Sequence, residues 1–115
     1  MTVKKEETVY PLRRERRSSI DAIVIAHCLD YSRRCDELLR RTMPRRVLME
    51  YRYLNSRIIT AAREVVGTQA EIYVRDIGMQ IGYAKSDAAS VSESIYKTRK
   101  KEVKRRIAQK LNLIG

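Results

Sequence analysis

VRDIGMQIGYAKSDAASVSESIYKTRKKEVKRRIAQKLNL, residues 74–113, decides how this chain is expected to fold. In its first part Val74, Ile77 and Ile81 recur at helical spacing. The small residue Gly78 falls on the same face, where a neighbouring helix must approach closely. The stretch therefore opens with an amphipathic helix that packs against a second helix.

A turn and a long second helix are expected to follow. Gly82 comes directly after the last apolar position, where a left-handed residue ends a helix. Ser86 and Asp87 then provide an N-cap signal, because both side chains accept hydrogen bonds from unpaired amides. About one apolar residue per turn continues from there: Val91, Ile95, Val103, Ile107 and Leu111. Residues 68–115 are thus predicted to form a helix-turn-helix unit with a long last helix.

The last helix is strongly basic. Residues 97–110 contain eight lysines and arginines and a single acid, Glu102, and the whole chain carries a formal net charge of +11. A field of this size requires a polyanion to neutralise it, and nucleic acid is the commonest one. The sequence therefore favours a DNA-binding protein over the alternatives of a solvated basic face and of membrane-surface binding, for which the helix lacks a broad apolar face.

The candidate DNA contacts fall into two groups. With Ala88, Val91 and Ile95 expected to face inward, the side chains that project towards base edges are Ser90, Glu93, Ser94, Lys97 and Lys101. Phosphate contacts are expected from Lys100, Lys104, Arg105 and Arg106. Lys85 and Ser86, at the predicted start of the helix, complete this set.

Residues 1–17 are interpreted as a flexible basic arm, interrupted by Pro11. Such an arm either contacts DNA, as N-terminal arms do in the minor groove, or only keeps the protein soluble. The candidate contacts in it are Arg13, Arg14, Arg16 and Arg17.

Residues 18–67 are predicted to form an antiparallel helical hairpin. The first helix is expected to start at a cap on Ser18 or Ser19 and to stop near Thr42. The second runs from Pro44 to Gly67, and the short link between them favours antiparallel packing. The apolar surface beyond one seam is covered either by the C-terminal helices or by a second copy, which would make a homodimer. That surface comprises Ile23, Ile25, Leu29, Ile59 and Val66.

The helix that contains Val74 is expected to begin at Thr68, because Thr68 and Glu71 have the spacing of a capping box, and to run to Ile81. The chain has 115 residues without Phe or Trp, which suits a modest helical core in an all-α fold. No apolar run reaches transmembrane length and the N-terminus does not resemble a signal peptide, so we expect a cytoplasmic protein.

Composition gives no support to enzymatic chemistry, a metal or a cofactor. His27 is the only histidine, and it fits a core position better than a catalytic base. Cys28 and Cys35 are seven residues apart on one expected helix, about 10 Å along its axis, which is beyond disulfide reach. Glycine-rich phosphate loops are absent from the sequence.

The pattern VRDIGMQIGY followed by IYKTRKKEVKRRIAQKL resembles the ArpU-like late-gene transcription regulators of Gram-positive phages. That resemblance covers a little over half of the chain, and it implies a sigma-factor-like helix-turn-helix, a phage or prophage origin and contact with RNA polymerase. The chain departs from the family's pattern by inserting residues 84–90, so the recognition helix begins either at Ser86 or as late as Ser92. The alternatives to a DNA-binding regulator are a protein-interaction factor that docks on RNA polymerase or another host protein, and a small DNA-packaging subunit.

Overall fold

The computed structural model describes residues 14–85 and 91–115, and every regular element in these ranges is a helix. No strand occurs in the described ranges, which confirms the all-α fold class. In chain order the elements are α2 (Arg14–Leu29), α3 (Tyr31–Arg40), α4 (Arg45–Val66), the 3-10 turn η1 (Gly67–Gln69), α5 (Ala70–Met79), the 3-10 turn η2 (Tyr83–Lys85) and α6 (Glu93–Lys110).

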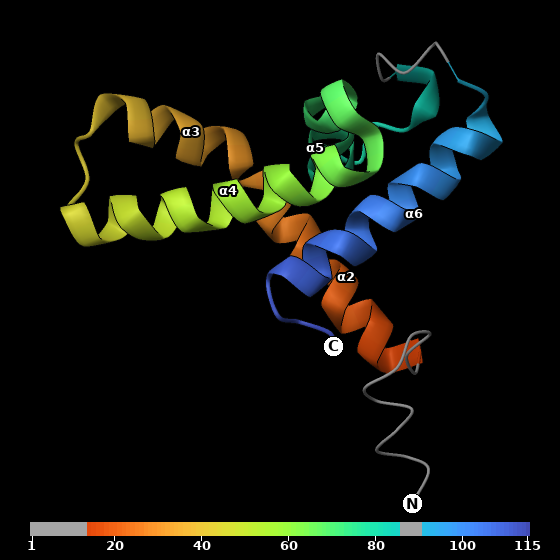
Figure 1. The fold of residues 1–115 in the computed structure, drawn as a ribbon, viewed down its shortest axis with the longest axis horizontal. Coiled ribbons are helices and arrows are strands. Elements are labelled where there is room, and N and C mark those ends of the chain that lie inside the picture. The colour runs from red at the N-terminus through yellow and green to blue at the C-terminus, as the bar shows by residue number, and fades with distance from the viewer. Residues whose placement is uncertain (1–13, 86–90) are drawn as a thin grey trace, which may run out of the picture.

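Two parts of the molecule can be distinguished in Figure 1. α3 lies alongside the first half of α4, and together they form an arm that projects from the rest of the fold. α5 and α6 pack on α4 closer to its C-terminal end, and α2 packs against both α5 and α6. The segment expected to be a hairpin therefore shares its packing with the segment expected to bind DNA.

The core lies where these four helices meet. Tyr73 and Tyr96 are its largest fully buried side chains, and they take the place of the Phe and Trp that the sequence lacks. Small residues such as Ala61 and Ala62 are also fully buried, which lets the helices approach α4 closely. The other buried apolar residues are Val24, Cys28, Ile58, Ala70, Val74, Ile77, Val103, Ile107 and Ala108.

The expectation of one helix from Ser18 to Thr42 is wrong, because the chain bends at Asp30 between α2 and α3. The buried guanidinium of Arg34 donates to the carbonyl of His27 in the last turn of α2, at 2.6 Å, and to Oδ1 of Asn55 on α4, at 2.7 Å. Asn55 also donates to the carbonyl of Tyr31, at 3.1 Å. These bonds satisfy backbone groups at the bend, so α2 can turn towards α5 while α3 follows α4.

The ends of the other helices agree in part with the sequence. α4 starts after Pro44 and ends at Gly67, which has a φ of +62°, as expected. α5 begins at Ala70 and not at Thr68, because η1 occupies the predicted first turn. It ends at Met79, where Gln80 and not Gly82 is the left-handed C-cap, with a φ of 54°.

Gly78 has the close approach that the sequence predicts, and its partner is α2. A Cβ placed on Gly78 would lie 2.5 Å from the backbone nitrogen of Leu29 and 2.6 Å from the carbonyl carbon of Cys28. No side chain fits into this space, so glycine sets how closely α5 crosses the end of α2.

The apolar surface that was expected to need cover is mostly covered within the chain. Ile25, Ile59 and Val66 pack against the core. Ile23 and Leu29 stay 41 % and 55 % exposed.

Candidate nucleic-acid interface

The position of α6 is fixed by a buried carboxylate on α5. Asp76 is fully buried and accepts three hydrogen bonds: from the backbone amide of Gly82 at 2.8 Å, from the hydroxyl of Tyr96, and from Lys100 at 3.2 Å. Tyr96 and Lys100 lie one turn apart on α6, while Gly82 lies in the turn after α5. Asp76 therefore joins α5, its following turn and the first half of α6.

The charge on Asp76 is maintained in spite of its burial. Burial alone would raise the pKa of this carboxyl. The hydrogen bonds from Tyr96, the Gly82 amide and Lys100 outweigh that effect, so the pKa lies below its ordinary value. Asp76 is thus ionised at neutral pH and holds Lys100 as its counter-ion.

Aromatic rings complete the contact between α5 and α6. Tyr96 stacks on Tyr73, with ring centroids 4.6 Å apart, and its centroid lies 5.5 Å from that of Tyr83. The hydroxyl of Tyr83 donates to the carbonyl of Val91 at 2.6 Å. This bond ties together the two described ends of the connection between α5 and α6.

Of the two starting points predicted for the last helix, the later one agrees with the structure. α6 begins at Glu93, and the side chain of Ser92 caps it by accepting from the amide of Ile95. Residues 80–92 therefore separate α5 from α6, a longer connection than the three or four residues of a usual helix-turn-helix. Ser86 and Ser90 lie outside the described residues, and Lys85 ends η2.

The first half of α6 is open to solvent. The expected outward residues Glu93, Ser94, Lys97 and Lys101 are all exposed, with Lys97 and Glu93 paired at 3.0 Å. Two side chains that were not expected there join them. Thr98 lies one turn after Ser94 and donates to its carbonyl at 3.0 Å, and Arg99 is also exposed.

The inward orientation predicted for Ile95 is wrong. Its side chain is 46 % exposed, whereas the neighbouring Tyr96 is buried. At about 100° per residue, burying both neighbours would require a wider contact than α5 offers. Val91 is partly buried, as expected, and Ala88 lies outside the described residues.

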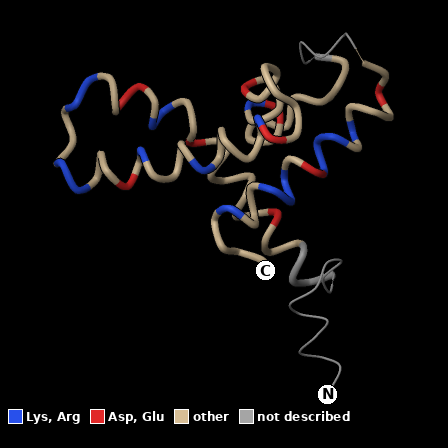
Figure 2. Tube along the Cα trace, viewed as in Figure 1, with Lys and Arg blue, Asp and Glu red and all other residues tan. Residues whose placement is uncertain are grey.

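The second half of α6 differs from the prediction, because its cations face acids of the same chain. Lys104 is 24 % exposed and lies 3.8 Å from Asp21 on α2. Arg106 and Lys110 pair with Glu64 on α4, at 2.9 and 3.0 Å, and Arg105 with Glu102. Of the four residues expected at phosphates, Lys100, Lys104, Arg105 and Arg106, none is fully exposed. Figure 2 shows this line of basic residues along α6.

Arg13 of the predicted basic arm lies outside the described residues. Arg14, Arg16 and Arg17 were expected in a flexible segment, but they belong to the first turns of α2. Ser18 and Ser19 therefore lie within a helix and do not cap it.

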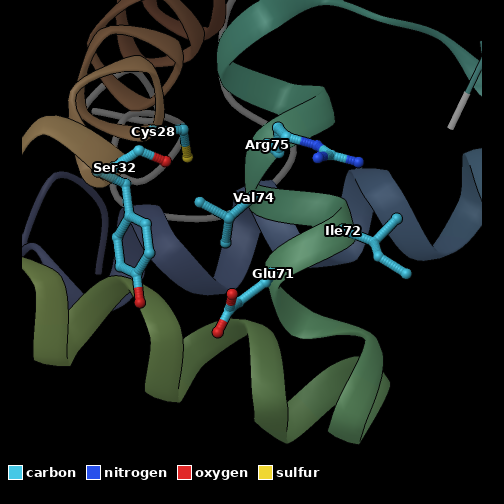
Figure 3. A pocket seen from close by; sticks show the side chains of 7 residues that line it. Cys28, Ser32, Glu71, Ile72, Val74 and Arg75 are labelled. Atoms are coloured by element: carbon cyan, nitrogen blue, oxygen red, sulfur yellow. The ribbon is translucent and has the colours of Figure 1, made fainter. Parts of the chain in front are cut away.

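A hollow of about 320 Å³ lies between α5 and the junction of α2 with α3 (Figure 3). Cys28, Tyr31 and Glu71 are among its lining residues. Burial raises the pKa of the Cys28 thiol to about 12. A thiol with this pKa is protonated at neutral pH and is a poor nucleophile, so this hollow does not favour covalent catalysis.

In the described part of the chain, no group of His, Cys, Asp and Glu side chains is arranged to hold a metal ion. None of the helices in residues 14–85 and 91–115 is long and apolar enough to cross a membrane. No family model, curated protein or solved structure matches this chain.

Proposed function

We propose that this protein is a sequence-specific DNA-binding regulator of transcription that places the first half of α6 in the major groove. The observation that carries this function is the contrast within α6. Residues 93–101 project to solvent from a helix that Asp76 fixes on α5, apart from Tyr96 and Lys100, which face α5. Helices that read DNA are presented in this way, with their N-terminal residues at the base edges and a second helix behind them.

The exposed face has the chemistry that base edges require. Ser94, Thr98 and Lys101 lie on the side of α6 opposite Tyr96. The Ser94 hydroxyl and the ammonium groups of Lys97 and Lys101 donate to guanine and thymine acceptors. The Thr98 hydroxyl donates to the carbonyl of Ser94 and can accept from a base amino group, as Glu93 can from cytosine. The half-exposed side chain of Ile95 suits contact with a thymine methyl group.

The ion pairs of α6 determine which of its cations remain available to DNA phosphates. Arg99 and Lys101 are exposed, whereas Lys104 and Arg106 face acids on α2 and α4. We therefore assign the phosphate-binding role on α6 to Arg99 and keep Lys101 among the base contacts. α5 and α6 then act as a helix-turn-helix with an extended connection.

The likeness of the chain from about Tyr51 onward to ArpU-like regulators extends this function to a phage or prophage protein of the cytoplasm that acts together with RNA polymerase. We also propose that the protein forms a homodimer. Leu29 at the end of α2 and Met79 at the end of α5 are 55 % and 61 % exposed and flank the crossing at Gly78. A second copy can cover them. Light scattering at micromolar concentration tests whether the homodimer forms, and a monomer mass contradicts it.

Selection of duplexes from a random pool tests DNA binding, followed by affinity measurements on two variants. Lys97→Ala is expected to reduce the preference for the selected site over random duplex about tenfold or more, because it removes a base contact, and to leave stability unchanged. Arg106→Ala is the matched control on the same helix. It breaks the contacts with Glu64 and Glu102, and is expected to lower stability but not specificity. Failure of the pool to enrich any sequence contradicts the function.

A further inference from the structure

The arm formed by α3 and the first half of α4 carries a second cluster of positive charge at its tip, residues 39–49. This tip contains Arg40, Arg41, Arg45 and Arg46 and no Asp or Glu, and all four arginines are exposed. None of them forms an ion pair with a residue in the described ranges. The cations in the second half of α6 face acids of their own chain, whereas those of the arm tip remain available to an external anion. Figure 2 shows the basic residues of the arm tip in blue at the far end of α3 and α4.

The kind of cation at the arm tip is informative. Residues 18–67 contain no lysine, so every cation of the arm is an arginine. A guanidinium group can donate two parallel hydrogen bonds to one phosphate, which an ammonium group cannot. Arg41 and Arg45 also line a hollow of about 350 Å³ between the ends of α3 and α4, together with Arg52. The arm tip therefore offers several exposed guanidinium groups to phosphate oxygens.

Arg41 is held in a backbone conformation that normally selects glycine. It is the C-cap of α3, with φ 57° and ψ 34°, and its amide donates to the carbonyl of Glu37 at 2.9 Å. A side chain in this left-handed region destabilises the fold relative to glycine. An arginine at this position is explained if its side chain serves binding and not folding.

We propose that the arm tip binds backbone phosphates of the same DNA duplex whose major groove receives α6. This inference rests on the function proposed above and adds a second, sequence-independent contact. The arm tip and the start of α6 lie towards opposite ends of the longest axis of the molecule, which extends over 49 Å (Figure 1). At 3.4 Å per base pair, a duplex that reaches both must span up to about 14 base pairs.

The salt dependence of affinity tests the contact directly. Each phosphate neutralised adds about 0.9 to the slope of log affinity against log salt concentration, so Arg45→Gln and Arg46→Gln should each lower the slope by about that amount. The fourfold variant R40Q/R41Q/R45Q/R46Q should lower it by about two to four. Arg63→Gln, which removes an exposed arginine from the far end of the same helix, is the control and should leave the slope unchanged.

Arg41→Gly separates binding from folding. Because glycine suits the left-handed C-cap, this variant should unfold at a higher urea concentration than the parent protein while binding duplex with a smaller salt slope. A weaker slope in a more stable protein cannot be attributed to loss of the fold.

Duplex length provides the second measurement. With the selected site placed in a 12-base-pair duplex, the parent protein and the fourfold variant should bind equally. In a 24-base-pair duplex the parent should bind about tenfold or more tightly than the variant, because only this duplex reaches the arm tip.

The experiments distinguish failure of the DNA-binding proposal from failure of the arm-tip proposal. A parent protein without salt-dependent affinity for any duplex contradicts DNA binding altogether. If the parent binds and Lys97→Ala loses specificity, but the fourfold variant keeps the full salt slope on the long duplex, only the arm-tip contact is overturned. The exposed Leu39 and Met49 would then indicate a protein partner for the arm.

Discussion

Nζ of Lys100 lies 3.2 Å from Oδ2 of Asp76, a carboxylate whose side chain is 1 % exposed. This pair connects α5 to α6 within the chain, so Lys100 contributes to the fold itself. The same holds for Lys104 and Arg106, which face Asp21 and Glu64. The positive charge of α6 therefore has two uses: its first half is available to a ligand, and its second half fastens the helix to α2 and α4.

Replacement of Asp76 by Asn should destabilise the protein by about 2–4 kcal/mol, because it leaves Lys100 half-buried without a counter-ion and weakens the bonds from Tyr96 and the Gly82 amide. Urea unfolding at pH 7, followed by far-UV circular dichroism, measures this loss. Lys101→Gln, on the exposed face of the same helix, should change stability by less than about 0.5 kcal/mol. Equal unfolding midpoints for the two variants would show that the buried pair does not hold α6.

The free energy of unfolding should decrease in acid, because the paired carboxylates become protonated. The pKa of Asp76 is lowered as described above, and hydrogen bonds from Lys110 and Arg106 lower that of Glu64. A carboxyl whose pKa is lower in the folded state stabilises the protein above its ordinary pKa of about 4, and this stabilisation is lost as the pH falls through the folded value. Urea midpoints measured from pH 6 to pH 3 should therefore fall steeply only below about pH 4. Asp76→Asn should show a smaller decrease over this range, and an unchanged decrease contradicts the role of Asp76.

Glycine-to-alanine substitutions distinguish packing from backbone conformation. Gly78→Ala places a Cβ against the backbone of Cys28 and Leu29, and it should destabilise the protein by about 3 kcal/mol or more because neither chain segment can move alone. Gly67→Ala meets no atom within 4 Å, so its cost of about 1–3 kcal/mol comes from the backbone alone, because L side chains rarely adopt a φ of +62° with a ψ of −127°. In an uncrowded helix, Gly→Ala would be stabilising, so the sign for Gly78 is decisive. Thermal unfolding of both variants provides the comparison.

Local signals in the sequence predict both ends of α4, the cap of α6 and the close approach at Gly78, but not the ends of α5 or the start of α2. Pro44 and Gly67 act through their own backbone preferences, and the later of the two predicted starts for α6 needs only the side chain of Ser92. Gly78 is recognisable because a small residue interrupts an otherwise apolar face. The roles of Pro44, Gly67 and Ser92 depend on neighbours in sequence, whereas the local pattern does not identify α2 as the partner of Gly78.

The bend at Asp30 and the ion pairs of α6 depend on residues distant in sequence. The apolar spacing continues through Asp30, and nothing local indicates that Arg34 will donate to His27 and to Asn55 on another helix. Likewise, counting the charges of α6 does not reveal that Glu64 will face Arg106. The exposure of Glu93, Ser94, Lys97 and Lys101 could be predicted from α6 alone. The exposure of Ile95 and the ion pairs in the second half of the helix depend on the tertiary fold.

Asn55 should prove essential for the attachment of α3. It accepts from Nε of the buried Arg34 and donates to the carbonyl of Tyr31, so Asn55→Ala leaves polar groups of both residues unsatisfied inside the arm. The expected cost is about 2–3 kcal/mol. Ser56→Ala, at the adjacent exposed position of the same helix, is the control and should be close to neutral.

Amide hydrogen exchange locates the effect of Asn55→Ala. Protection should decrease throughout α3, because Asn55 bonds to its first turn and to Arg34, while α6 keeps its protection through Asp76 and the Tyr73–Tyr96 stack. If protection falls equally in α3 and α6, the arm unfolds together with α5 and α6. The bend at Asp30 would then be a joint within one cooperative fold and not the boundary between two units of different stability.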